Sequence, residues 1–216
     1  MPQVNEEQLQ EILRLLAQQQ QHQHIERVQA ARRGAERQQA IDETPQRKYA
    51  IIVAVDDQGG FSKDEKIPWD FPQDLKWFKD RTEGHICVMG RKTYENINSR
   101  LDDKMATSVL PNRRCFVLSN TVQEYPNATI IKGLLEIENH LADEDADKTI
   151  FIIGGERLYK EGLSLVDTVY VTALNSDYQC DKFFPVVYLM EHFYTQKIYR
   201  RDDSPELRFT VWKRKR

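Results

Sequence analysis

The sequence predicts an α/β domain with a mostly parallel central sheet, an antiparallel C-terminal edge and flanking helices, preceded by an N-terminal helical extension. From Tyr49 onward, short apolar runs alternate with stretches of helical periodicity, which is typical of parallel sheets with crossover helices. The run 49–55 is apolar throughout, as expected of a strand buried on both faces. The last two extended segments, 192–200 and 207–213, flank a turn at 202–205 and are expected to pair antiparallel.

The extension is set apart by a change of composition near residue 48. The first 47 residues contain twelve Gln and no Phe, Tyr or Trp. Leu9, Ile12, Leu13 and Leu16 share one helix face, but the Gln run at 18–21 interrupts any regular coiled-coil repeat. The residues leave two interpretations open: a solvated or disordered tail, or a helix that mediates homo-oligomerisation or docking to an assembly.

The predicted elements follow one another at short intervals from residue 48 to the C-terminus. We expect strands at 49–55, 86–89, 115–118, 129–131, 149–153, 168–174, 192–200 and 207–213. We expect helices at 72–82, 90–97, 134–141 and 156–161. Pro72 stands at the first helical position, where its missing N–H costs nothing.

Bulk properties exclude several classes of protein. A net charge of −3 over 216 residues gives no bias toward nucleic acid or an anionic membrane. The chain has three cysteines, too few and too scattered for a disulfide framework or a zinc site. No apolar stretch reaches the length of roughly 18 residues that a membrane span requires. The expected location is the cytoplasm.

The segment 67–78 places a carboxylate beside apolar side chains. Asp74 falls in the first turn of its helix, where the helix dipole favours negative charge. Leu75 and Phe78 are three residues apart and can form one wall of a slot next to it. There the carboxylate could accept two parallel hydrogen bonds from a flat, amidine-like heterocycle. On local physics alone, a carboxylate that merely favours the helix start remains the more frequent explanation.

Two further strand-to-helix junctions carry glycine. Gly90 and the pair Gly154-Gly155 each end a predicted strand, and a helix follows at once. Backbone N–H groups at such helix starts bind phosphate, and glycine lets it come close. Arg91, Lys92 and Arg157 add positive charge at the same points. The G-x-G-x-x-G dinucleotide fingerprint is absent, so ordinary tight turns are an equal alternative at this stage.

In this order the motifs resemble the dihydrofolate reductase family, over nearly four fifths of the chain. The segments that carry the resemblance are Ala54-Val55-Asp56, Ile67-Pro68-Trp69, Pro72-Gln73-Asp74-Leu75-Lys76-Trp77-Phe78, Met89-Gly90-Arg91-Lys92-Thr93-Tyr94, Asn112-Arg113-Arg114, Leu118-Ser119, Ile153-Gly154-Gly155 with Tyr159, and Asp181-Lys182-Phe183-Phe184-Pro185. It implies reduction of 7,8-dihydrofolate to tetrahydrofolate with NADPH as cofactor.

The resemblance also implies a substrate site. Asp74 is expected to hold the pterin and to support its protonation, and Trp69 to order a water beside it. Arg113 is expected to pair with the α-carboxylate of the glutamate tail, a role suited to a bidentate guanidinium. The remaining substrate contacts implied are Ile52, Ala54, Leu75, Phe78, Ile97, Leu110 and Thr172.

On the cofactor side, the resemblance implies a phosphate-binding turn and a pair of glycines that relatives join by a cis peptide. The cofactor contacts implied are Ala54, Gly90, Arg91, Lys92, Thr93, Leu118, Ser119, Gly154, Gly155, Arg157, Leu158 and Tyr159. Arg91, Ser119 and Arg157 are expected at the 2′-phosphate, and the segment 57–66 is expected to close over the nicotinamide. The sequence departs from the family at Ser62, where glycine is usual, at Asn120, where serine is common, and in a longer segment 98–109.

Two alternatives compete with this interpretation. The pyrimidine reductases of riboflavin synthesis share the fold and NADPH, but the block from Pro68 to Phe78 with Asp74 argues against them. A structural role, such as association of a phage-type member with a virion through the extension, is the second alternative. It is compatible with catalysis, because no residue that the chemistry needs is missing.

Overall fold

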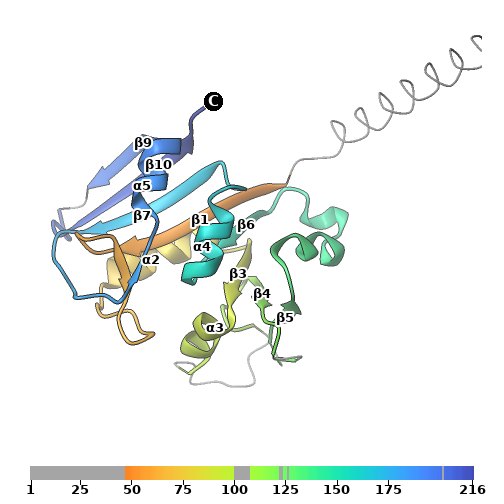
Figure 1. Cartoon of the computed structure of the whole chain (residues 1–216). Coiled ribbons are helices and arrows are strands. Elements are labelled where there is room, and N and C mark those ends of the chain that lie inside the picture. The colour runs from red at the N-terminus through yellow and green to blue at the C-terminus, as the bar shows by residue number, and fades with distance from the viewer. Residues whose placement is uncertain (1–46, 100–107, 122–123, 126, 201) are drawn as a thin grey trace, which may run out of the picture. The chain divides into compact units, whose positions relative to one another are not determined.

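The computed structural model describes residues 47–216, with gaps at 100–107, 122–123, 126 and 201 (Figure 1). The chain divides into two units, 1–46 and 47–216, and the second unit is described below. The helix predicted in the extension and its docking role lie outside the described residues, as does most of the longer segment 98–109.

An eight-stranded sheet forms the centre of the described unit, in the order β5-β4-β3-β6-β1-β7-β10-β9. Its strands are β1 (Lys48–Val55), β3 (Ile86–Gly90), β4 (Arg114–Leu118), β5 (Thr129–Ile131), β6 (Thr149–Ile152), β7 (Thr168–Leu174), β9 (Phe193–Arg200) and β10 (Leu207–Arg214). The first six of these are mutually parallel, whereas β10 pairs antiparallel with both β7 and β9. The predicted fold class is confirmed.

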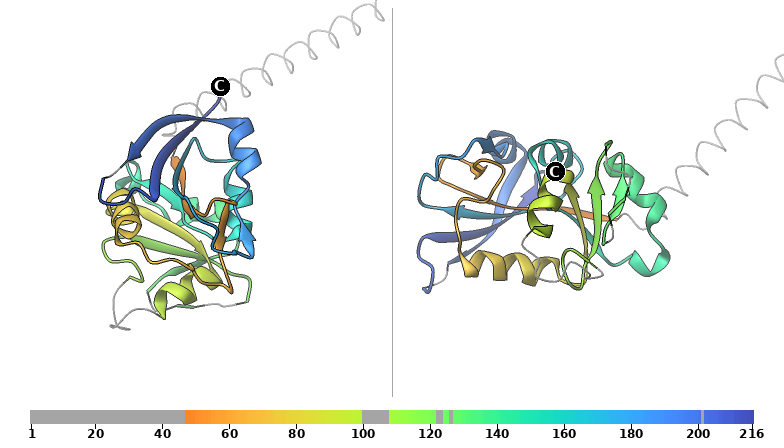
Figure 2. Two further views of the ribbon diagram at one scale, coloured as in Figure 1. Left: turned by 90° about the vertical axis from the view of Figure 1, so that its left-hand side faces the viewer. Right: turned by 90° about the horizontal axis from the view of Figure 1, so that it is seen from below.

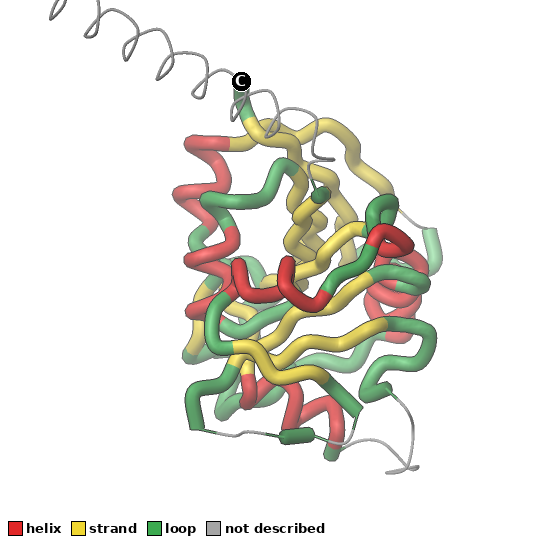
Figure 3. Tube along the Cα trace, turned by 90° about the vertical axis from the view of Figure 1, so that its right-hand side faces the viewer, coloured by secondary structure: helices red, strands yellow, loops and turns green. Residues whose placement is uncertain are grey.

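Helices cover both faces of this sheet (Figures 2 and 3). On one face, α2 (Pro72–Thr82) and α3 (Arg91–Asn98) contribute Trp77, Phe78 and Tyr94 to an apolar cluster with Ile52. On the other, α4 (Glu156–Gly162), α5 (Val186–His192) and the 3₁₀ helix η1 (Leu134–His140) pack against alternate residues of the same strands. Burial on both faces accounts for the unbroken apolar runs of the central strands.

Most predicted elements agree with the structure to within two residues at each end. The helix expected at 134–141 is a 3₁₀ helix, and a second short one, η2 (Asp143–Asp145), follows it. His192, expected to begin a strand, ends α5, where its Nδ1 lies 3.0 Å from the Tyr188 carbonyl. Helix α5 and the small antiparallel pair of β2 (Gly60–Ser62) and β8 (Lys182–Phe183) were not predicted.

The topology gathers the chemically interesting residues at one edge of the sheet. Gly90 ends β3, Leu118 ends β4 and Gly154 follows β6 within two residues. Because these strands are parallel, their carboxyl ends lie at the same edge. Ligands of open α/β sheets bind at this edge, so the fold itself supports a site there.

Candidate functional site

Asp74 is a half-buried carboxylate in the first turn of α2. Phe71 is the N-cap and Pro72 opens the helix, so the turn presents Asp74 without a competing side-chain cap. The buried Thr172 hydroxyl of β7 donates a hydrogen bond to the carboxylate. Burial raises the pKa of Asp74, and the bond from Thr172 partly offsets this. The result is an acid that holds its proton at higher pH than an exposed aspartate.

Trp69 packs in an apolar cluster beside β1 and carries a donor without a partner in the described structure. It joins Ala54, Trp77 and Phe209 in one apolar cluster, and Ala54 is the register partner of Thr172. The Trp69 indole Nε1 is buried and has no hydrogen-bond partner in the described structure. Buried donors are seldom left unpaired, so this atom indicates a place for a water or a ligand acceptor.

Four of the six predicted apolar contacts of the substrate come together, whereas Ala54 packs in the neighbouring cluster with Trp69 and Phe209. Phe78, Ile97 and Leu110 are partly buried against the same cluster as the buried Ile52. Leu75 does not pack with them, because its side chain is 58% exposed on the surface of α2. Its predicted place in the wall of the slot therefore has no packing contact to support it.

Arg113 is a buried guanidinium held by neutral partners. Its Nε donates to the Thr82 hydroxyl at 3.0 Å and its Nη1 donates to the Pro111 carbonyl at 2.7 Å. The guanidinium carbon lies 5.8 Å from the centre of the Phe78 ring. Among the ion pairs of the described residues none involves Arg113, so its charge is available to an incoming carboxylate.

Gly90 and the Gly154-Gly155 pair meet in a backbone cradle. The Gly90 N–H donates to the Gly154 carbonyl at 2.7 Å, and the Gly154-Gly155 peptide is cis. Gly154 has φ +125°, a conformation that residues with side chains rarely adopt. A Cβ built on Gly154 lies 3.3 Å from the Tyr159 hydroxyl and 3.5 Å from Thr93 Oγ1. Added side chains would fill this space, which suits a cofactor lying against the backbone.

Tyr159 connects this cradle to the carboxylate side. Its ring is buried, and its hydroxyl donates to the Ile52 carbonyl of β1 at 3.2 Å. Burial, and secondarily the charge of Asp74, raise the pKa of Tyr159 well above its usual range. The charge of Asp74 thus acts on the buried tyrosine whose hydroxyl lies beside Gly154.

The cations predicted at the cofactor phosphates already have carboxylate partners. Arg91 Nη1 lies 2.8 Å from Glu95 Oε1, Arg157 Nε lies 2.7 Å from Glu161, and Lys92 forms an ion pair with Glu65. Motif reasoning missed these partners. The i,i+4 spacing signals the first two, whereas nothing local signals Glu65, which is 27 residues away from Lys92.

The other predicted cofactor residues lie at the strand ends and on α4. Leu118 is buried at the end of β4, and Leu158 is buried on α4. Ser119, the next residue after β4, is also buried. Its N–H donates to the Ile131 carbonyl, and its Oγ accepts the Thr121 N–H at 3.3 Å. Asn120, where the family commonly has serine, is exposed.

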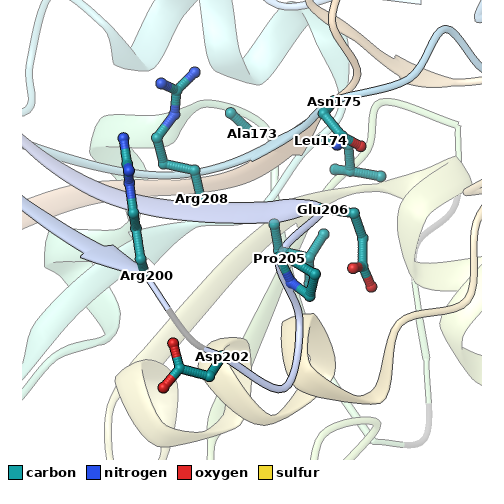
Figure 4. A pocket seen from close by; sticks show the side chains of 9 residues that line it. Ala173, Leu174, Asn175, Arg200, Asp202, Pro205, Glu206 and Arg208 are labelled. Carbon is teal, nitrogen blue, oxygen red and sulfur yellow. The ribbon is translucent and has the colours of Figure 1, made fainter.

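A separate pocket of about 530 Å³ lies at the turn between β9 and β10, beside the end of β7 (Figure 4). Arg200 and Arg208 extend to one side of the strands there, and Asp202 and Glu206 to the other (Figure 4). None of its lining residues is among the predicted site residues.

Within the described ranges of 47–216, no helix is long and apolar enough to span a membrane. The same residues contain no group of three or more His, Cys, Asp or Glu side chains suited to a metal ion.

Comparison with known proteins gives consistent results. Residues 48–216 match the family described as dihydrofolate reductase. The chain is 31% identical to the dihydrofolate reductase of Haemophilus influenzae over 170 residues, covering 77% of this chain and 99% of the relative. It is 31% identical to that of Bacillus subtilis over 137 residues, or 63% of this chain and 74% of the relative.

A solved structure is also similar. The dihydrofolate reductase of Enterococcus faecalis, complexed with NADP(H) and RAB-propyl, superposes with a TM-score of 0.65 at 28% identity. The match covers 78% of this chain and 97% of that one.

Proposed function

Because the chain belongs to the dihydrofolate reductase family, we propose that it reduces 7,8-dihydrofolate to tetrahydrofolate with NADPH. The observation that carries the proposal is the half-buried Asp74, which accepts a hydrogen bond from Thr172 of β7 and whose charge raises the pKa of Tyr159 beside the glycine cradle. This arrangement puts an acid next to a place where a dinucleotide can lie.

Asp74 binds the pterin and supports its protonation. Its two oxygens accept hydrogen bonds from a ring N–H and the neighbouring amino group, in the bidentate geometry that suits an amidine-like edge. The raised pKa of Asp74 matters because a general acid works best when its pKa lies near the working pH. Trp69 Nε1 orients a water beside the pterin, through which a proton can reach the ring nitrogen.

Arg113 binds the other end of the substrate. Thr82 and the Pro111 carbonyl hold the guanidinium in place, so a carboxylate on the glutamate tail meets a preorganised fork. The Phe78 ring beneath it lies in the apolar cluster that contacts the middle of the substrate.

The cofactor side holds a dinucleotide by backbone and charge. Gly90, Gly154 and Gly155 leave room for it, and the first turn of α3 presents N–H groups with no side-chain cap. Lys92 and Arg91 exchange their carboxylate partners for phosphates. NADPH, when bound, supplies the hydride, and the protein orients it and excludes water.

The direct test follows NADPH oxidation by absorbance, with dihydrofolate present or absent and methotrexate as inhibitor. We expect oxidation that depends on dihydrofolate and is blocked by methotrexate. NADPH binding without turnover would contradict the proposed activity and favour a protein that keeps the fold for a structural role.

Asp74→Asn tests the assigned residue. We expect turnover to fall by about 10²–10⁴-fold, the usual contribution of a positioned acid. Affinity for NADPH, measured by fluorescence titration, should stay within about twofold, because Asp74 lies on the substrate side. Asp80→Asn, an exposed carboxylate on the same helix, is the matched control. Near-normal turnover of Asp74→Asn would remove the assigned role.

A further inference from the structure

Asp56 is a buried carboxylate to which neither the motifs nor the proposed reaction gives a role. It follows β1 directly and is 3% exposed. Its Oδ1 accepts the N–H of Gln58 at 3.0 Å and of Gly60 at 2.7 Å, within its own loop. Its Oδ2 accepts the N–H of Tyr178 at 3.3 Å, and the Cys180 thiol also donates to this carboxylate. One carboxylate therefore joins two segments more than 115 residues apart in the chain.

The packing around this carboxylate leaves no free space. A Cβ built on Gly60 would lie 2.3 Å from the Cβ of Cys180 and 3.0 Å from Asp56 Oδ2. Glycine is needed at position 60 because the two segments approach so closely. Backbone bonds also join the two segments, among them the pairing of β2 with β8 and the Phe184 N–H to the Gly59 carbonyl at 2.9 Å. Nearer the surface, the Asp64 N–H donates to the exposed Asp181 carboxylate at 3.1 Å.

The loop that Asp56 holds reaches the cofactor side of the site in two places. The Phe61 ring meets the buried Tyr159 ring edge to face, with centroids 5.3 Å apart. Glu65 pairs with Lys92, and its carbonyl accepts from Asn96, both on α3. Releasing the loop would thus disturb contacts beside the glycine cradle.

We propose that Asp56 is a positioning residue that fastens the loop 57–66 to the segment 176–184 and so keeps Phe61 and Glu65 against the cofactor side of the site. A surface contact could be replaced by water at little cost. By contrast, losing the buried acceptor leaves the part-buried Tyr178 N–H without this partner, which is unfavourable. The part of this inference that concerns NADPH rests on the proposed function.

Asp56→Asn distinguishes the contacts of Asp56 within its own loop from its contacts with the segment 176–184. The amide oxygen can still accept from Gln58 and Gly60, so the turn within the loop survives. The amide nitrogen cannot accept from Tyr178 or Cys180, so these two contacts with the segment 176–184 are lost, while the backbone pairing of β2 with β8 remains. Asp57→Asn is the matched control, because its exposed carboxylate accepts only from its neighbour, Gln58.

The first measurement is the alkylation rate of Cys180 by iodoacetamide at pH 8 in the full chain, located by peptide mass spectrometry. Burial and the neighbouring Asp56 raise the pKa of the Cys180 thiol to about 12, which makes it unreactive. We expect Asp56→Asn to speed its alkylation about tenfold, because thiolate is the reactive form. Asp57→Asn should change it less than twofold. Cys87 and Cys115, both buried, serve as internal references. Equal Cys180 rates in all three proteins would overturn the proposal.

The second measurement is NADPH affinity by fluorescence titration. We expect Asp56→Asn to weaken NADPH binding about tenfold. Asp177→Asn, at an exposed carboxylate outside the loop that accepts the Gln179 N–H at 2.6 Å, should leave it unchanged. Faster alkylation with unchanged affinity would overturn the link to the cofactor side. If the unaltered protein binds no NADPH while alkylation still responds to Asp56→Asn, the proposed function fails and the contact between Asp56 and Cys180 stands.

Discussion

At the scale of the residue, Asp74 has two properties that oppose one another. Its burial raises its pKa, which suits proton handling, but a buried charge with only a hydroxyl partner is unfavourable at neutral pH. Function at this position therefore costs stability.

Asp74→Asn should consequently make the folded protein more stable at pH 7. Because the folded pKa is raised, the carboxyl stabilises the fold fully below the unfolded pKa near 3.8, and that stability is lost as pH rises through the folded pKa. Asparagine has no charge to bury, so the gain should appear at pH 7 and vanish near pH 3.8. Urea unfolding midpoints at the two pH values check this. A less stable variant at pH 7 would contradict the account.

Glu95 forms an ion pair with Arg91, whose guanidinium the family resemblance assigns to the 2′-phosphate. Arg91 Nη1 contacts both carboxylate oxygens, at 2.8 and 2.9 Å. Glu95→Gln should tighten NADPH binding about twofold to fivefold, because an exposed ion pair of this kind is weak. NADH, which lacks that phosphate, should bind as before. Fluorescence titration with both nucleotides checks the difference, and equal effects on the two would contradict it.

At the scale of the element, α2 is held on the sheet by a cation stacked among aromatic rings. The guanidinium of Arg81 lies 4.1 Å from the Trp77 ring centre, 5.5 Å from Tyr170 and 5.7 Å from Tyr199. These contacts fix the end of the helix whose first turn carries Asp74.

Arg81→Ala should lower the free energy of unfolding by about 1 kcal/mol, the usual contribution of a cation over aromatic rings. Lys79→Ala is the control, since Lys79 is exposed on the same helix. Urea denaturation of the two variants measures the difference. Equal losses would show that the stacked rings do not stabilise α2.

The elements that sequence predicted best are those whose signals are local. Helix α2 was predicted to the residue, because Pro72 marks its start and apolar spacing continues to Thr82. Strand β2 escaped prediction because its three residues are stabilised by pairing with β8, more than 115 positions along the chain. The 3₁₀ geometry of η1 has nearly the same apolar spacing as an α-helix, so its type could not be distinguished.

The same distinction applies to the site. Glycines and the carboxylate at strand-to-helix junctions could be predicted, because junction, residue type and helix start are all local. The exposure of Leu75, the pairing of Lys92 with Glu65 and the burial of Asp56 depend on segments far apart in the chain. The motifs were enough to predict which residue types line the candidate site, whereas the partners of those residues could be identified only from the folded structure.

At the scale of the whole molecule, all predicted site residues fall within the unit 47–216. Arg47 and Tyr49, at its start, both bond to Glu138. Deleting residues 1–46 keeps these contacts, so we expect turnover within a few-fold of the full chain. We also expect a change in oligomeric state or partner binding, measured by light scattering. If both measurements are unchanged, the docking role of the extension has no support.

The position of β6 has a consequence for how the chain is made. β1 and β3 are not neighbours, because β6 lies between them and pairs with both. A nascent chain that has emerged only as far as residue 148 holds both strands but not the one that joins them. Contacts between segments so distant in sequence form slowly. Until β6 and β7 emerge, the edges of β1 and β3 are open to pairing with other chains, so the interval of synthesis between residues 90 and 174 is when this protein most needs a chaperone.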